Sequence, residues 1–146
     1  MTSFIQKITN TTSGLASTIL RIPVGIILMA HGAQKLFGAF GGYGLEGTGQ
    51  WMASIGLEPG YLMALLAGSA EFFGGLALVI GLLVRPASAV IAFTMLMAIV
   101  TVHISNGLFM ANNGYEYALT LLIVSVSLVF SGAGSFSIDK AISAKS

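Results

Sequence analysis

Four ionisable side chains interrupt long apolar stretches of the sequence: His31, Glu71, His103 and Glu116. Their neighbours are mainly Leu, Ile, Val, Ala, Gly and Met, as in segments that lie in a bilayer. An ionisable group at membrane depth costs about 3 kcal/mol or more unless a partner or water compensates it. Carboxylates and imidazoles can transfer protons and can hydrogen-bond a ligand. We therefore expect these four residues to be the catalytic groups, which hold a ligand or pass protons inside the membrane.

Three further polar residues are candidates for binding a cofactor: Arg21, Gln34 and Lys35. Gln34 and Lys35 follow His31 by three and four residues, so a helix presents all three on a similar face. Arg21 stands near the start of the same apolar stretch, where a long basic side chain is expected to reach the cytoplasmic interface. In a functional interpretation, Lys35 or Arg21 would set the local electrostatic potential of the site.

Several of these residues also have a purely structural interpretation. Glu71 could pair with Lys35 or with a histidine as a buried ion pair. His103 could hydrogen-bond the backbone of a neighbouring helix, while Glu116 and Lys35 could be solvated near the membrane surface. Glu71 is the strongest functional candidate because it lies deep in its apolar stretch, where a carboxylate that faces lipid is most costly.

Metal and haem binding are alternatives for the same side chains. Two His and two carboxylates suffice for a zinc, iron or manganese site, formed by His31, Glu71, His103 and Glu116. A local motif such as HExxH is absent, and each residue lies in a different apolar stretch. A bis-histidine haem between His31 and His103 is a further alternative. The chain has no cysteine, which excludes disulfides, thiolate metal sites and iron–sulfur clusters, so electrons would reside on a bound cofactor, a quinone or a partner.

The composition indicates one membrane domain that covers residues 1–146. The chain is 55% hydrophobic and 8% charged, whereas soluble domains carry about 25% charged residues. Its net charge of +1 gives no basic footprint for nucleic acid. The first fifteen residues are polar and lack the features of a signal peptide, so we expect them to form a short soluble tail.

Four apolar stretches predict an all-α fold, a four-helix transmembrane bundle. Each stretch has about 17 to 25 residues, the length that crosses a hydrocarbon core of about 30 Å as a helix. The predicted helices are 17–37, 60–84, 86–105 and 115–131, with a longer Gly-rich connection at 38–59.

Local signals predict how these helices begin, end and pack. Arg85-Pro86 is expected to end the second helix and begin the third, because Pro is tolerated in a first turn and disfavours helix before it. Thr48 is expected to cap a short helix that turns Trp51 toward the membrane. Small residues recur at four-residue spacing along the second helix, which favours close packing or self-association.

Lys and Arg residues predict the orientation in the membrane. They occur in the N-terminal tail, between the second and third helices and at the C-terminus, as Lys7, Arg85, Lys140 and Lys145. The other two connections have few or none, so the positive-inside rule places both termini in the cytoplasm. The four ionisable residues then fall in the outer half of the bundle, where we expect them to line a polar pocket.

A series of short motifs runs from the first apolar stretch to the C-terminal segment. The motifs are Arg21-x-x-x-Gly25, His31-Gly32-x-x-Lys35, Trp51-Met52-Ala53, Glu71-x-x-Gly74-Gly75, Asn113-Gly114-x-Glu116 and Gly132-x-Gly134. In this order and spacing they resemble the DoxX family of membrane proteins. The resemblance implies four transmembrane helices in the bacterial inner membrane. It also implies a link to quinone-coupled oxidation of sulfur compounds or catechols, although many members have no assigned reaction.

The leading interpretation is a membrane oxidoreductase subunit that binds a quinone or a related small molecule. His31 or His103 would hydrogen-bond a quinone carbonyl, and Glu71 or Glu116 would exchange the proton that accompanies electron transfer. The expected partners are the lipid bilayer and a redox protein that carries the electron-transferring cofactor, together with a possible homo-oligomer. Two alternatives stay open: a non-enzymatic structural or assembly subunit, and a metal-binding or transport protein that uses the same His and Glu residues.

Overall fold

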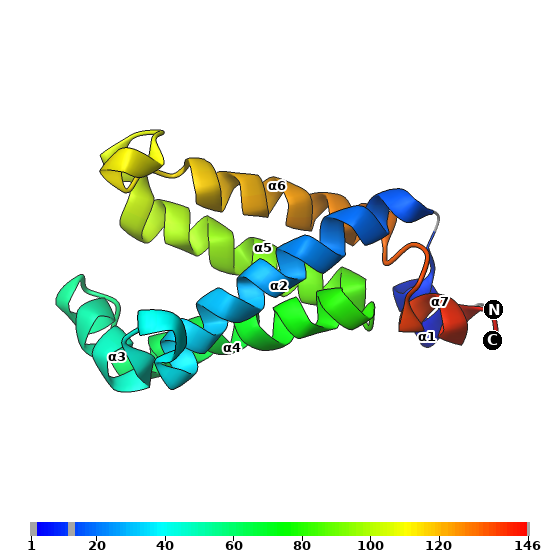
Figure 1. Ribbon diagram of the computed structural model, residues 1–146, viewed down its shortest axis with the longest axis horizontal. Helices are drawn as coiled ribbons and strands as arrows, with labels where there is room; N and C mark the ends of the chain where they lie inside the picture. Colours follow the sequence, from blue (N-terminus) through cyan, green and yellow to red (C-terminus); the bar gives the residue numbers. More distant parts are fainter. Residues whose placement is uncertain (1–2, 12–13, 146) are drawn as a thin grey trace.

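The computed structural model describes residues 3–11 and 14–145, and the described part of the chain is helical without any β-strand. Its four long helices are α2 (Leu15–Phe37), α4 (Gly60–Ile80), α5 (Val84–Ala98) and α6 (Glu116–Ser131). α2 packs along α4 and α5 packs along α6, while α4 also contacts α5 (Figure 1). The all-α prediction is confirmed for the described residues.

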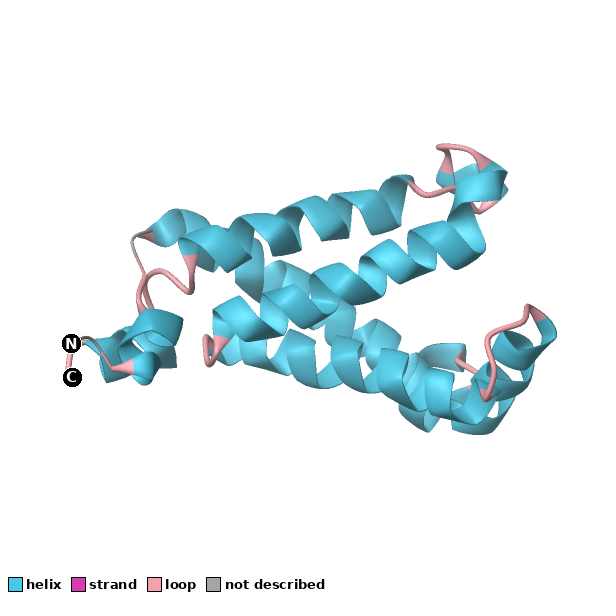
Figure 2. Ribbon diagram, turned by 180° about the vertical axis from the view of Figure 1, so that it is seen from behind, coloured by secondary structure: helices cyan, strands magenta, loops and turns pink. Residues whose placement is uncertain are grey.

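Successive long helices run in opposite directions, so their ends gather at two ends of the molecule (Figure 1). At the terminal end, the short helices α1 (Phe4–Thr9) and α7 (Ile138–Ser143) pack together. At the opposite, distal end lie α3 (Gly44–Ser54) and the connection between α5 and α6. The α5–α6 pair diverges from α2 and α4 toward the distal end, and Figure 2 shows the same divergence from behind.

Three helical segments of the described chain are long and apolar enough to cross a membrane. They are Leu15–Phe37, Gly60–Ile80 and Val84–Asn106. The third continues α5 through a π turn, η2 (Ile99–His103), and a 3-10 turn, η3 (Ile104–Asn106). α6 is also apolar but has 16 residues, fewer than the roughly 20 that span a typical bilayer. The chain is therefore a multi-pass membrane protein by the length and composition of its helices.

α2 and α4 approach so closely that only glycine fits at their contact. A Cβ atom on Gly25 would lie 2.6 Å from the carbonyl oxygen of Gly75, and one on Gly75 would lie 2.6 Å from the carbonyl oxygen of Gly25. Gly32 faces the backbone of Phe72 in the same way. Small residues let helix backbones approach in lipid. The small-residue spacing predicted for the second helix thus serves packing within the chain.

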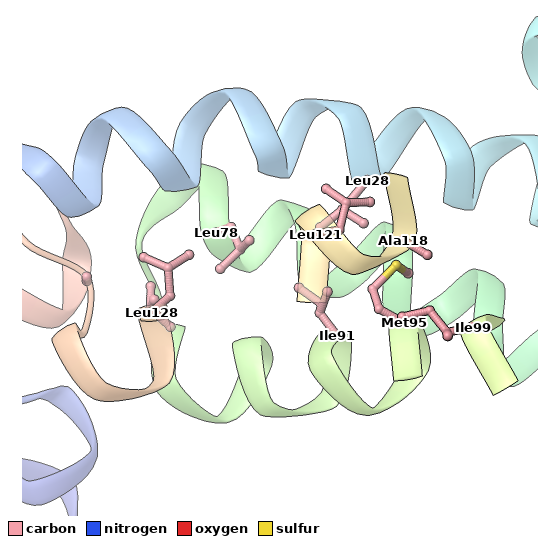
Figure 3. Packing of buried hydrophobic residues seen from close by; sticks show 10 residues of the cluster. Leu28, Leu78, Ile91, Met95, Ile99, Ala118, Leu121 and Leu128 are labelled. Carbon is pink, nitrogen blue, oxygen red and sulfur yellow. The ribbon is translucent and has the colours of Figure 1, made fainter. Parts of the chain in front are cut away.

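A buried apolar cluster joins the four long helices on their inner sides. Leu28 of α2 and Leu78 of α4 face Ile91 of α5 and Leu121 and Leu128 of α6 (Figure 3). All five side chains are 5% exposed or less. Lipid tails are as apolar as leucine, so this cluster stabilises the fold through van der Waals packing rather than through escape from water.

Arg21 organises the terminal end from a fully buried position. Its guanidinium donates hydrogen bonds of 2.6–2.9 Å to backbone carbonyl oxygens at the end of α4 and in the segment after α6. These acceptors are Leu78, Val79, Ala133, Ser135 and Phe136. The last carbonyls of a helix have no partner within the helix, so they need outside donors when they are buried. The prediction that Arg21 extends to the membrane surface is therefore wrong, because its side chain is 0% exposed.

Arg85 and Asp139 complete this arrangement at the terminal end. Arg85 donates to the carbonyl oxygen of Phe130 at 2.7 Å, near the end of α6, and to that of Asn10 at 3.0 Å. The carboxylate of Asp139 accepts the backbone N–H groups of Leu83 at 2.8 Å and Val84 at 2.9 Å, at the start of α5. Acidic caps at helix N-termini and basic donors at C-termini complement the helix dipole.

Two predictions about helix boundaries are wrong. α4 ends at Ile80, and the following turn places Gly81 and Leu83 in the left-handed region with φ of 72° and 51°. Arg85-Pro86 thus lies in the first turn of α5 rather than between two helices. Thr48 is buried inside α3, which begins at Gly44, so it does not cap that helix.

The N-terminal segment also differs from the expected soluble tail where the structure describes it. Ser3 and Gln6 form a reciprocal capping box that starts α1, with bonds of 3.0 and 3.2 Å. α1 packs against α7 and contacts α5, so the segment is part of the fold.

Replacing Gly25 by valine is expected to destabilise the protein by about 1–3 kcal/mol, because the larger side chain would overlap the backbone of α4. The measurement is the thermal unfolding midpoint of the purified chain in detergent. Ala16→Val, at an exposed position of the same helix, is the matched control and should change the midpoint little. Equal midpoints for the two variants would contradict the close α2–α4 contact.

Candidate functional site

An ion pair joins the two most closely packed helices. Nζ of Lys35 on α2 lies 2.7 Å from Oε2 of Glu71 on α4. The side chains are 24% and 8% exposed, respectively, so the carboxylate is the more deeply buried partner. Of the interpretations offered for Glu71, the structure therefore shows the ion pair with Lys35. A buried charge that is compensated in this way is tolerated, whereas either partner alone would be costly.

His31 lies one helical turn before Lys35 and faces α6. Its ring centroid is 5.7 Å from that of Tyr117, with the two rings inclined at 33°. Nδ1 of His31 lies 3.1 Å from the carbonyl oxygen of Ile27. A carbonyl oxygen only accepts hydrogen bonds, so Nδ1 carries the proton in this arrangement. Nε2 is then left without a partner among the described residues and is available to a ligand.

Tyr117 of α6 lies next to the same part of α2 as the ion pair. Its ring packs against His31, and His31 lies one helical turn from Lys35, which pairs with Glu71. His31, Lys35, Glu71 and Tyr117, which we call the polar cluster, thus come from α2, α4 and α6. The cluster combines an imidazole, an ammonium, a carboxylate and a phenol. These groups can donate and accept hydrogen bonds and can exchange protons.

Tyr117 is the member of the polar cluster that sequence reasoning missed. Its only signal is its position directly after Glu116 at the start of an apolar stretch. A tyrosine at that position is usually interpreted as an interface aromatic. Only the packing of α6 beside α2 distinguishes it from the other tyrosines.

His103 and Glu116 make their contacts in the connection between α5 and α6. Nδ1 of His103 donates to the carbonyl oxygen of Asn113 at 2.9 Å, and the Asn106 amide donates to the same oxygen at 3.2 Å. Oε1 of Glu116 accepts the backbone N–H of Met110 at 2.8 Å. Two of the four predicted catalytic residues therefore belong to the polar cluster, and the other two order this distal connection.

The predicted cofactor-binding residues are separated along α2. Lys35 belongs to the polar cluster, but the Gln34 amide donates to the carbonyl oxygen of Phe40 at 3.4 Å in the turn after the helix. Arg21 precedes Lys35 by fourteen residues, or about 21 Å along a helix. Its N–H groups are bound to backbone carbonyls at the terminal end. Among the described residues, no hydrogen bond or ion pair joins the side chain of Gln34 or Arg21 to the cluster.

Metal ligands do not gather in the described part of the chain. No group of three or more His, Cys, Asp or Glu side chains there could hold a metal ion. Two surface hollows lie elsewhere, one of about 310 Å³ between α1 and α7 and one of about 270 Å³ between α3 and α4. Neither is lined by a residue of the polar cluster.

The helices and the polar cluster define the class as a multi-pass helical membrane protein with polar side chains between its spans. The DoxX family model matches residues 16–104, and the chain belongs to the DoxX family. This matched region contains His31, Lys35 and Glu71, whereas Tyr117 lies beyond it.

Two relatives match most of the chain. The Bacillus subtilis protein named "Putative oxidoreductase CatD" is 33% identical over 125 residues, which cover 86% of this chain and 85% of that protein. A Haemophilus influenzae protein named "Uncharacterized protein" is 32% identical over 127 residues, covering 82% of this chain and 85% of that protein. No solved structure matches the chain.

A double-mutant cycle on Lys35→Met and Glu71→Met tests the ion pair. Each single variant is expected to lose about 1–3 kcal/mol of stability, because it leaves one charge uncompensated at a half-buried or buried position. The double variant should lose less than the sum, which gives a coupling energy measured from unfolding midpoints in detergent. Strictly additive losses would show that the two charges do not stabilise each other.

Proposed function

We propose that this protein is a subunit of an oxidoreductase system in the bacterial inner membrane, and that it binds a quinone or a related small molecule at the polar cluster. The observation that carries this proposal is that the Lys35–Glu71 ion pair and the His31–Tyr117 ring contact lie one helical turn apart on α2 and join three helices. A quinone headgroup presents two carbonyl oxygens, which accept hydrogen bonds and take up protons on reduction. The cluster supplies donors and proton carriers of the matching kinds.

Each side chain has a defined role in this proposal. The Tyr117 hydroxyl donates a hydrogen bond to a quinone carbonyl. With its proton on Nδ1, neutral His31 has an acceptor at Nε2 for the hydroxyl of the quinol, and the imidazolium form donates from Nε2 to a carbonyl oxygen of the quinone. The Lys35–Glu71 pair holds its charges next to these groups and stabilises the charge that develops on the headgroup. Conversion of quinone to quinol takes up two electrons and two protons. The electrons come from a partner protein and the protons pass through the cluster.

In this proposal the ligand approaches the cluster on the side where His31 of α2 and Tyr117 of α6 face each other. α6 packs mainly along α5 and contacts α2 only slightly. His31 and Tyr117 are both half-buried. A hydrophobic quinone could therefore enter from the lipid side, with His103 and Glu116 as proton carriers between the cluster and the distal surface. The name of the Bacillus subtilis relative supports the link to an oxidoreductase.

The proposed topology is a four-helix bundle with α6 as its fourth span and with both termini in the cytoplasm. Among the described residues, Lys7, Arg21, Arg85, Lys140 and Lys145 belong to segments at the terminal end, whereas Lys35 is the one Lys or Arg near the distal end of a long helix. This asymmetry follows the positive-inside rule. In this proposed topology the polar cluster lies in the outer half of the membrane.

A structural role is the second candidate function, and the ion pair itself favours it. A 2.7 Å contact between Lys35 and Glu71 fixes the register of α2 against α4 without any ligand. Polar contacts of this kind can specify assembly at some cost in stability. In that case the double variant Lys35→Met/Glu71→Met would retain cellular function, whereas the quinone proposal requires that function be lost.

Quinone binding is expected to weaken by about 3- to 10-fold in Tyr117→Phe and in His31→Ala, the effect of one lost hydrogen bond. The measurement is titration of the purified full chain with a short-chain quinone, followed by isothermal calorimetry. His103→Ala is the control, because its imidazole contacts the distal connection and should leave equilibrium binding unchanged. A chain extracted from membranes without quinone, together with unchanged binding in both cluster variants, would overturn the proposal.

The topology is tested by single cysteines, since the natural chain contains none. Ala144→Cys and Asn112→Cys introduce exposed thiols at the terminal and distal ends. In intact spheroplasts, a membrane-impermeant maleimide should label Asn112→Cys and should label Ala144→Cys only after lysis. The reverse labelling pattern would show that both termini lie outside the cytoplasm and would contradict the proposed topology.

A further inference from the structure

A polar hollow lies between the two terminal helices. It has a volume of about 310 Å³ and is lined by Gln6, Lys7 and Asn10 of the N-terminal segment and by Ser143 of α7. An ammonium, two amides and a hydroxyl can all donate hydrogen bonds. This lining suits a ligand with several acceptor oxygens and a negative charge.

The surface around the hollow carries uncompensated positive charge. Lys7, Lys140 and Lys145 are exposed, and none forms an ion pair with a residue in the described ranges. The acidic side chain nearest to them in the chain is Asp139, which is 1% exposed and bound through both oxygens to the backbone at the start of α5. The exposed charge at this end is therefore positive, which favours an anionic partner.

Large apolar side chains are exposed beside these lysines. Phe4 of α1 is 77% exposed and Phe136, just before α7, is 81% exposed. Phe136 has a φ of 52°, a conformation that L-residues avoid, and Arg21 binds its carbonyl oxygen at 2.6 Å. The backbone therefore holds this phenylalanine outward at a conformational cost. Aromatic groups next to lysines are typical of segments that lie in a membrane interface.

The hollow also lies beside the ends of helices that are long enough to cross a membrane. The 21 residues of α4 extend about 31 Å, the thickness of a hydrocarbon core. α4 ends at Ile80 and α5 begins at Val84. Nε of Arg85 donates a 3.0 Å hydrogen bond to the backbone carbonyl oxygen of Asn10, one of the lining residues. The hollow is thus fixed next to the point where the spans leave the hydrocarbon.

We propose that this terminal surface binds an anionic phospholipid. Lys7, Gln6 and Asn10 hold the phosphate group in the hollow, Lys140 and Lys145 contact neighbouring headgroups, and Phe4 and Phe136 insert among the acyl chains. The site is separate from the polar cluster and does not depend on quinone binding. Its occupant is a lipid rather than a free anion, because the lysines and the exposed phenylalanines are used together.

Native mass spectrometry of the full chain in detergent, titrated with phosphatidylglycerol or phosphatidylcholine, tests this site. The natural chain should bind phosphatidylglycerol more tightly than phosphatidylcholine. Lys7→Gln/Lys140→Gln should weaken phosphatidylglycerol binding by about fivefold per lysine and leave phosphatidylcholine binding unchanged. Gln50→Glu/Asn112→Asp changes the net charge equally at exposed distal positions and is the matched control.

The outcomes separate the lipid from its alternatives. Phe4→Ala should weaken phosphatidylglycerol binding, whereas Phe40→Ala, an equally exposed phenylalanine at the distal end, should not. Circular dichroism checks that each variant retains its helix content. The proposal is overturned if the lysine variant binds phosphatidylglycerol like the natural chain or if the distal control loses the same affinity. It is also overturned if inorganic phosphate displaces the lipid at equal concentration, because the hollow would then be a free anion site.

Discussion

The buried guanidinium of Arg21 is the interaction on which the terminal end of the molecule depends. Its donors reach α4 and the segment that follows α6, so one side chain joins parts of the chain that are far apart in sequence. Hydrogen bonds to a charged group contribute about 1.5–3 kcal/mol each in mutational series, although such values do not add. Here they also satisfy helix-end carbonyls that would otherwise be buried without partners. Lysine could not replace this planar fork of donors.

The helices could be predicted from the sequence because long apolar segments in a bilayer have few alternatives. The boundaries were less predictable, and the α4–α5 turn shows why. Arg85-Pro86 carries the familiar signal of a break, but Asp139, more than fifty residues later, caps α5 at Leu83 and Val84. That cap allows Leu83 to adopt a left-handed conformation usually reserved for glycine. Local sequence contains no trace of this distant carboxylate.

The residues of the candidate site could also be predicted only in part. His31 and Lys35 lie on one helical face by spacing alone, and Glu71 was expected to need a partner, so their association followed from the sequence. The association of Tyr117 with them did not follow from the sequence, because an aromatic residue in an apolar stretch gives no sign of which helix it faces. His103 and Glu116 have the same residue types as the cluster, yet they bind backbone groups of their own connection. Residue type indicates what a side chain can do, while its partners depend on how the helices pack.

The π turn at Ile99–His103 has a consequence for how the length of this region can change. A π turn accommodates one residue more than an α turn, and each residue of an α-helix rotates the following side chains by about 100°. Loss of one residue within the turn would restore a regular helix and leave the first part of α5 in place. Because the π turn already holds the extra residue, its loss would let the segments on either side keep their relative orientation, including the imidazole that binds Asn113. Elsewhere in α5 the same deletion would rotate every later side chain by about 100°.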